Sequence, residues 1–134
     1  MREIKFRAWD KITKQYYAVK GLEYDDGNLD EVYLAGLKIS ESNPVFNLRK
    51  PSDVILEQST GLKDKNCKEI YEGDIVDDGY SLICEIRWSE HFTAFEAINE
   101  NDGYVSNIWF VAKYGEVIGN IHENKELLKE KNEH

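Results

Sequence analysis

Two cysteines and two histidines are the side chains of this sequence best suited to hold a metal ion: Cys67, Cys84, His91 and His122. Zinc sites normally draw half of their ligands from one close pair, such as Cys-x2–4-Cys or His-x3–5-His, and these residues form no such pair. Cys84 also falls on the apolar face of an expected strand, which favours a small buried hydrophobic side chain. We therefore expect neither a metal ion nor a cofactor.

A short acidic segment resembles the beginning of a calcium-binding loop. Asp26, Asn28 and Asp30 have the spacing of the first three oxygen ligands of an EF-hand. However, Glu31 stands where that loop needs glycine, and Leu37 stands where it needs its last glutamate. A solvated hairpin turn is the interpretation that we prefer.

Recognisable catalytic motifs do not occur in the sequence. There is no Gly-x-Ser-x-Gly elbow for a nucleophilic serine and no glycine-rich loop that would cradle a phosphate. Carboxylates are abundant, but their spacing singles out no pair for acid–base catalysis. We prefer a non-enzymatic role and leave open a small hydrolase that acts on nucleotides. Such an enzyme would need a pocket that holds two or more titratable groups with shifted pKa values.

Aromatic residues, 12% of the chain, indicate a different kind of function. Tyr16 and Tyr17 are neighbours, as are Trp109 and Phe110, and adjacent side chains of a strand point to opposite faces. One member of each pair should therefore face outward, where aromatic residues favour protein interfaces. We expect an interaction surface at these pairs, with packing against a second sheet as the alternative.

A third candidate lies at Tyr71, Glu72 and Asp74, because Gly73 between them lets the backbone approach a ligand closely. The competing interpretation, which we prefer, is a tight turn or bulge at Gly73 with Tyr71 in the core.

The elements that would position these residues are mostly strands. Alternation of apolar and polar residues predicts a hairpin over 2–20 and strands over 54–59, 82–88, 92–98, 104–112 and 115–121. Asp-Gly pairs at 26–27, 78–79 and 102–103 favour tight turns between antiparallel strands. Segment 28–40 fits a strand or a short helix, and 41–52 is mostly loop. Asn124 is the expected cap of a short C-terminal helix that carries Leu127 and Leu128.

Length and charge set further bounds. A chain of 134 residues fits one domain, and its net charge is −9, from 26 acidic and 17 basic residues. This charge repels phosphate backbones and anionic lipid headgroups, so we expect no direct binding of nucleic acid or membrane. The opening MREIKFRAWD contains no apolar signal segment, and we expect a cytoplasmic protein with reduced thiols.

Three segments together resemble a known family. They are MREIKFRAWD at the start, TGLKDKNCKEIYEGDIV over 60–76 and EVIGNIHEN over 116–124. They resemble the motifs of the YopX family of small phage and prophage proteins, and the likeness extends over effectively the whole chain. Cys67 stands where the family usually has glycine, which predicts a left-handed backbone there or an altered turn. Lys125 replaces a proline that commonly begins the last helix.

The resemblance implies a mainly β fold of antiparallel hairpins, with a partly open SH3-like barrel around 73–76 and a short C-terminal helix. We expect one domain over 1–134, with an N-terminal sub-part over 1–52 and a barrel-like sub-part over 53–124. The resemblance also implies a phage or prophage origin in a bacterial host, and it carries over no catalytic residue.

We therefore expect a non-enzymatic module for protein interaction or self-assembly, forming homo-oligomers or binding a host or phage protein. An acidic decoy that inhibits a nucleic-acid-binding protein of the host is an alternative. It predicts that carboxylates such as Asp25, Asp26, Asp77 and Asp78 line up on one face.

Overall fold

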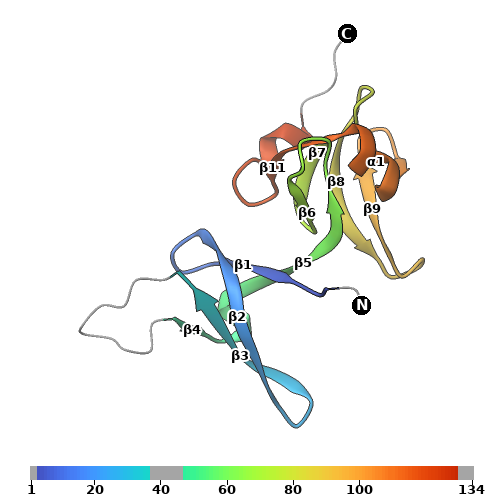
Figure 1. Cartoon of the computed structure of the whole chain (residues 1–134). Helices are drawn as coiled ribbons and strands as arrows, with labels where there is room; N and C mark the ends of the chain where they lie inside the picture. The colour runs from blue at the N-terminus through green and yellow to red at the C-terminus, as the bar shows by residue number, and fades with distance from the viewer. Residues whose placement is uncertain (1–2, 37–46, 130–134) are drawn as a thin grey trace. The chain divides into compact units, whose positions relative to one another are not determined.

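The computed structural model describes residues 3–36 and 47–129 (Figure 1). Its strands are β1 (Phe6–Asp10), β2 (Gln15–Asp25), β3 (Asn28–Ala35), β4 (Leu48–Arg49), β5 (Val54–Lys63), β6 (Glu69–Tyr71), β7 (Asp74–Asp77), β8 (Ile83–Ser89), β9 (Ala94–Asn99), β10 (Tyr104–Asn107) and β11 (Glu116–Asn120). The helical segments of the described residues are the α-helix α1 (Ile108–Tyr114) and two 3-10 turns, η1 (Pro51–Asp53) and η2 (Lys125–Leu128).

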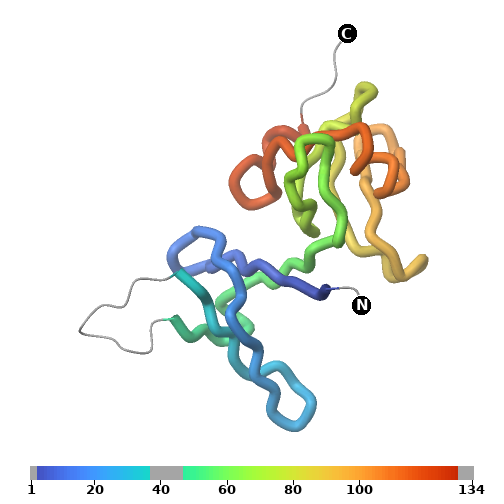
Figure 2. The backbone as a smooth tube through the Cα atoms, viewed as in Figure 1, coloured from blue at the N-terminus to red at the C-terminus, as the bar shows by residue number. Residues whose placement is uncertain are grey.

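Strands account for 56% of the structure and pair antiparallel, which confirms the mainly β prediction. The chain divides into two compact units: an N-terminal unit, Ile4–Gln58, and a C-terminal unit formed mainly by residues from Ser59 onward. Strand β5 runs through both, since its first part pairs with β1 and its last part pairs with β6. Figure 2 follows the chain along β5, in green, from one unit into the other.

The N-terminal unit has the strand order β4-β3-β2-β1-β5. The predicted first hairpin is confirmed by the pairing of β1 with β2. The next hairpin turns at Asp26 (φ 48°) and Gly27 (φ 80°), two positive-φ residues that suit the type I′ turn expected for Asp-Gly. Segment 28–40 is a strand as far as Ala35, and Leu37 lies outside the described residues. The expected loop over 41–52 is described only from residue 47, where it contains β4 and the start of η1.

A buried carboxylate holds the first turn of this unit. Asp10 accepts hydrogen bonds from the Thr13 amide at 3.1 Å and from the Thr13 hydroxyl at 2.7 Å. It also forms an ion pair with Arg49 of β4, with 2.9 Å between Nε and Oδ1. Asp10 thereby connects the β1–β2 turn to the far edge of the sheet.

The C-terminal unit contains a five-stranded sheet of order β10-β9-β8-β7-β11. Cys84 and Ile86 of β8 point into its core, which confirms the expectation of a buried Cys84. The core cluster consists of Ile70, Val76, Cys84, Ile86, Ala97, Val111 and Ala112. Alternate residues of β8, namely Ile83, Glu85 and Arg87, belong to its other face. The sheets are not closed into a barrel, so the SH3-like barrel is not confirmed.

The strand predicted over 104–112 is wrong beyond Asn107, where α1 begins. The Asn107 side chain accepts a hydrogen bond from the Trp109 amide at 2.8 Å and thus caps the helix. Val111 and Ala112 are buried and bring α1 against the core. Residues of high strand propensity form a helix here because this packing outweighs local preference.

The predicted C-terminal helix is the 3-10 turn η2. Asn124 precedes it but makes no side-chain capping bond to it. Instead, Asn124 Oδ1 accepts a hydrogen bond from the Asn120 amide at 3.2 Å. The side chain that we expected to cap a helix therefore closes the turn that follows β11.

Candidate functional site

The segment around Gly73 is a tight turn fastened on both sides. The Tyr71 amide donates a hydrogen bond to Asp74 Oδ2 at 2.7 Å, and Asp74 is almost fully buried. Gly73 (φ 88°) donates to the carbonyl of Ile86 at 2.8 Å and accepts from the amide of Ile121 at 2.9 Å. Asp74 therefore serves the turn itself. The tight turn at Gly73 agrees with the preferred interpretation of this segment, but Tyr71 is half-buried and not in the core as that interpretation expected.

Tyr71 and Glu72 are both half-buried beside this turn. The Tyr71 hydroxyl donates to Glu69 Oε2 at 3.2 Å, so its polar end is engaged within the unit. The structure thus places Tyr71, Glu72 and Asp74 close together in a turn whose hydrogen bonds are made within the chain.

Tyr16 and Tyr17 lie on β2 of the N-terminal unit and are both half-buried. Tyr17 packs against the apolar core of that unit. Tyr16 packs edge-to-face on Trp9 at 5.1 Å between ring centroids, lies under the Arg7 guanidinium, and donates to Glu57 Oε1 at 2.8 Å. Both rings therefore make most of their contacts within the N-terminal unit.

Trp109 and Phe110 belong to a different environment on α1, where Phe110 lies beside three tyrosines and Trp109 is exposed. Phe110 stacks on Tyr80 with 5.4 Å between ring centroids and contacts Tyr114 at 4.9 Å. Tyr104 joins Tyr80 and Phe110 in lining a shallow depression. We call the set the aromatic surface; it comprises Tyr80, Tyr104, Trp109, Phe110 and Tyr114.

A short loop positions Tyr80 on this surface. Asp78 Oδ1 accepts hydrogen bonds from the amides of Tyr80, Ser81 and Leu82 at 2.8, 3.1 and 3.2 Å. A Cβ atom added at Gly79 (φ 87°) would lie 2.5 Å from the carbonyl oxygen of Tyr114. Glycine therefore lets the loop pack directly on the end of α1.

The sequence singled out Trp109 and Phe110 but not Tyr80, Tyr104 and Tyr114, the tyrosines of the aromatic surface. The helical spacing of Phe110 and Tyr114, four residues apart, was the available signal. A strand over this region would have separated those rings.

Charge is sparse on the aromatic surface. Lys113 is the charged residue of α1, and its Nζ lies 5.4 Å from the ring centroids of both Trp109 and Tyr114. The other residues that line the depression, apart from the buried Asp78, are uncharged. This face differs from the acidic character of the whole chain.

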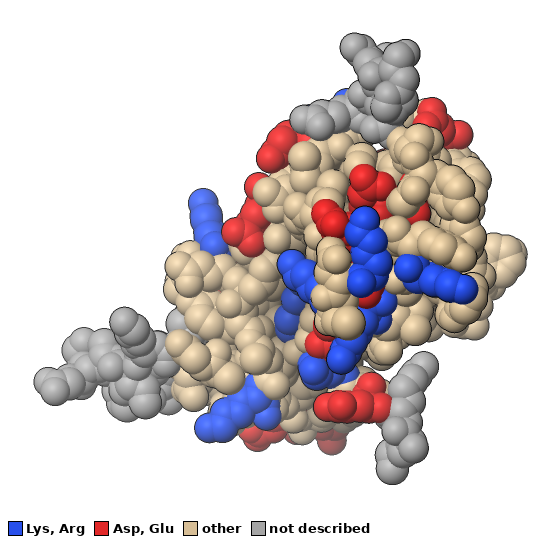
Figure 3. Space-filling model, turned by 45° about the horizontal axis from the view of Figure 1, so that its top comes forward, with Lys and Arg blue, Asp and Glu red and all other residues tan. Residues whose placement is uncertain are grey.

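Several carboxylates are turned inward. Asp10, Glu57, Asp64, Asp74 and Asp78 are all buried. Hydrogen bonds from the chain's own amides and side chains engage these groups, so they add little to an acidic surface. The face drawn in Figure 3 carries basic as well as acidic side chains.

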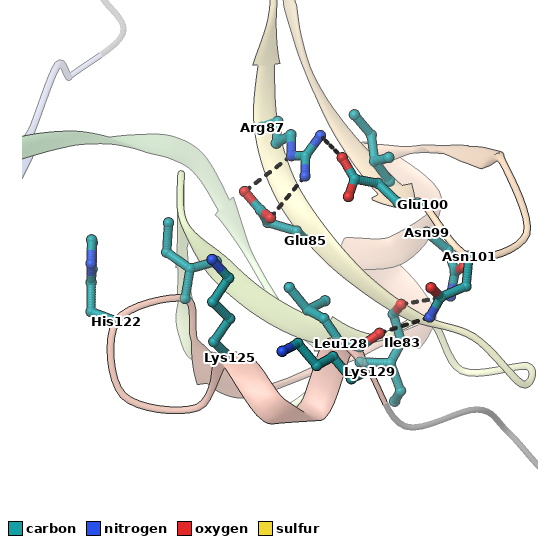
Figure 4. Close-up of a pocket in the computed structure, with 12 residues that line it drawn as sticks. Ile83, Glu85, Arg87, Asn99, Glu100, Asn101, His122, Lys125, Leu128 and Lys129 are labelled. Carbon is teal, nitrogen blue, oxygen red and sulfur yellow. Dashed lines mark hydrogen bonds and ion pairs between the residues drawn. The ribbon is translucent and has the colours of Figure 1, made fainter.

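A cavity of about 510 Å³ lies in the C-terminal unit against the outer face of β8 (Figure 4). Apolar residues from four places in the sequence line it: Ile83, Ile98, Ile121 and Leu128. Its charged and titratable lining consists of Glu85, Arg87, Glu100, His122, Lys125 and Lys129. We call it the β8–η2 cavity.

Arg87 is bound between two carboxylates in this cavity. Its Nε lies 3.1 Å from Glu85 Oε2, and its Nη1 lies 2.6 Å from Glu100 Oε1. Arg87 donates hydrogen bonds to Glu85 and Glu100, which raise the pKa of Arg87, and Arg87 in turn lowers the pKa of Glu100. Both shifts favour the charged forms, so this pair suits ion pairing and not proton transfer near neutral pH.

The described residues contain no group of three or more His, Cys, Asp or Glu side chains that could hold a metal ion. Cys67 is exposed, whereas Cys84 is buried, and burial raises the pKa of the Cys84 thiol to about 12. Within the same part of the chain, every helix is too short or too polar to cross a membrane.

Comparison with solved structures found protein EF1440 from Enterococcus faecalis. It is 31% identical, with a TM-score of 0.66, over 96% of this chain and 99% of that chain. The structure of protein yopX from Bacillus subtilis is 22% identical, with a TM-score of 0.56, over 95% of this chain and 98% of that chain, and shows a shared fold. A comparison with curated proteins found no match. The YopX protein family matches residues 5–129, and the chain therefore belongs to the YopX family.

Proposed function

We propose that the protein is a non-enzymatic interaction module that assembles with a second copy of itself through the aromatic surface. The exposure of large rings in one place carries this proposal: the exposed fraction is 71% for Tyr80 and 60% for Trp109. Clustered aromatic side chains are typical of the centres of protein interfaces, where they lose much water-accessible area on binding.

Charge directs contact with a second copy to the aromatic surface. Two chains that each carry a net charge of −9 repel one another over most of their surfaces. The aromatic surface is a face with few charges, so contact there brings few like charges together. Its Lys113 can approach ring faces of the other copy, as it approaches Trp109 and Tyr114 in its own chain.

The edge strand β10 supports the same arrangement. This strand lies at one edge of the five-stranded sheet. Its residues Tyr104 and Val105 are exposed to solvent, with exposed fractions of 49% and 52%. An unpaired strand edge beside an apolar face is a ready site for strand addition by another chain. Pairing of β10 with β10 of a second copy would extend the aromatic contact. Phage or prophage origin and a cytoplasmic location stay predictions.

Sedimentation velocity over a range of concentrations tests the proposal. The wild-type protein should reach twice its chain mass of 15.6 kDa as concentration rises. The double variant Tyr80→Ser/Trp109→Ser should stay at the mass of one chain. Tyr24→Ser and Phe92→Ser are the matched controls, because both rings are exposed but lie outside the aromatic surface, and they should dimerise like wild type.

Circular dichroism melting of each variant verifies folding. A wild-type protein that stays monomeric at every concentration would overturn self-assembly. A dimer that survives in the double variant would exclude the aromatic surface as its interface.

A further inference from the structure

The β8–η2 cavity is independent of the aromatic surface and has an apolar floor. Ile83 of β8 and Ile98 of β9 belong to adjacent, paired strands, with Ile98 opposite Glu85 in the register. Leu128 of η2 and Ile121, which follows β11, add apolar side chains to the lining of the cavity. Figure 4 shows the C-terminal segment beside β8, with Lys125, Leu128 and Lys129 on it.

Two hydrogen bonds hold the walls of the cavity in place. Asn101 Nδ2 donates to the carbonyl of Leu128 at 2.8 Å and so joins the β9–β10 turn to η2. Asn99 Nδ2 donates to the carbonyl of Ile83 at 2.8 Å. The cavity is therefore formed before any ligand arrives, and its volume falls in the range of small-molecule sites.

The charges of the cavity are not balanced. Arg87 is occupied by Glu85 and Glu100. Lys125 and Lys129 also line the cavity, and no carboxylate of residues 3–36 and 47–129 lies within ion-pair distance of either. The charge of Lys125 acts on Glu100 from farther away and contributes to the lowered pKa of that carboxyl. Three cations thus face two carboxylates, a local excess of positive charge in a chain of net charge −9.

We propose that the β8–η2 cavity binds a small organic anion that carries an apolar ring or chain. The apolar part lies against Ile83, Ile98 and Leu128, and the phosphate or carboxylate head lies between Lys125 and Lys129. Lysine ammonium groups act as point charges for such heads, and the apolar floor removes the rest of the ligand from water.

Nitrogen-15 chemical-shift titration of the full chain tests this site. Phenyl phosphate and phenylacetate present the two kinds of head on the same ring. Inorganic phosphate lacks the ring, and benzyl alcohol lacks the charge. We expect phenyl phosphate or phenylacetate to shift the amides of Ile83, Ile98 and Leu128, and to bind about tenfold more tightly than either incomplete probe. The tighter of the two identifies the preferred head.

Charge reversal provides the matched comparison. Lys125→Glu/Lys129→Glu should weaken binding of the better probe at least about tenfold. Lys20→Glu/Lys63→Glu changes net charge equally at exposed lysines outside the cavity and should leave affinity near the wild-type value. Added salt should weaken binding to the wild type, because the attraction is partly screened.

Circular dichroism melting establishes that both double variants are folded. Shifts that map to the aromatic surface instead of the cavity, or equal weakening by the two double variants, would overturn the proposal. So would the absence of any saturable shift with both complete probes.

Discussion

Asp64 and Val117 are joined by a hydrogen bond of 2.8 Å, in which the Val117 amide donates to Asp64 Oδ2. The other oxygen of Asp64 accepts from the amides of Asn66 and Lys68, each at 2.9 Å. One buried carboxylate therefore closes the β5–β6 turn and fastens it to β11. Two of the three segments that carry the family resemblance, 60–76 and 116–124, are tied together by this contact.

Replacement of this carboxylate should destabilise the C-terminal unit. Asp64→Asn replaces one carboxylate oxygen, which accepts a hydrogen bond from a backbone amide, by an NH2 group that cannot accept one. We therefore expect a loss of about 2 kcal/mol in the free energy of unfolding. Urea unfolding followed by tryptophan fluorescence measures it. Asp102→Asn, at an exposed carboxylate of the same unit, should change stability by less than about 0.5 kcal/mol. Equal effects of the two changes would contradict the role of Asp64.

The same contact makes stability depend on pH. Burial alone would raise the pKa of Asp64, but hydrogen bonds from Val117, Lys68 and Asn66 outweigh burial and hold the pKa below 3.8. A carboxyl whose pKa is lowered by folding stabilises the protein above its unfolded pKa and loses this effect as pH falls through the folded value. Wild-type stability should therefore drop more steeply than that of Asp64→Asn as pH falls from about 5 towards 2. Parallel curves in urea titrations would refute this.

The ion pair of Asp10 and Arg49 should behave as a coupled unit. Arg49→Met alone leaves a buried carboxylate without its cation, and we expect a loss of about 3 kcal/mol. Asp10→Asn alone removes the carboxylate that pairs with Arg49, and it should cost a similar amount of unfolding free energy. The double variant should lose less than the sum of the two, because neither charge is then left unpaired. A double-variant cycle of urea unfolding measures this coupling, and strict additivity would exclude it.

Two glycines with similar backbone conformations should respond differently to alanine. Gly27 has φ 80° and open space around it, so Gly27→Ala should cost about 1 kcal/mol from the left-handed backbone alone. Gly79 has φ 87° and would place its new Cβ 2.5 Å from the Tyr114 carbonyl oxygen. Gly79→Ala should cost roughly 3 kcal/mol, because the loop must shift away from α1. Thermal unfolding compares them, and equal losses would mean that the contact with Tyr114 is unimportant.

Cys67 adopts φ 65°, so of the two alternatives for this position, a left-handed backbone or an altered turn, the left-handed backbone is the one found. Glycine takes this conformation without steric cost, although it also gains freedom in the unfolded chain. We therefore expect Cys67→Gly to stabilise the protein by about 0.5 kcal/mol. Chemical denaturation measures the change, with Cys67→Ser as the control that keeps the side-chain size and should be near neutral. A destabilising glycine would contradict the strain at Cys67.

The sequence by itself determined the antiparallel β hairpins. Alternation over 82–88 and the turn chemistry of Asp26 and Gly27 are local properties, since side-chain direction and positive φ depend on neighbours along the chain. The burial of Cys84 followed from the same alternation. The turn at Gly73 was also predictable from the sequence, because glycine adopts a backbone of positive φ without the steric cost that other residues incur.

Only the tertiary structure decided where the candidate sites lie. Asn107 could have continued a strand, and the packing of Val111 against the core made the next residues helical. That helix brings Phe110 onto Tyr80, a pairing between segments far apart in the sequence. The cavity beside Arg87 likewise forms where η2 approaches β8. Such long-range contacts compete with local preference by burial and hydrogen bonding, and sequence spacing does not encode which of them wins.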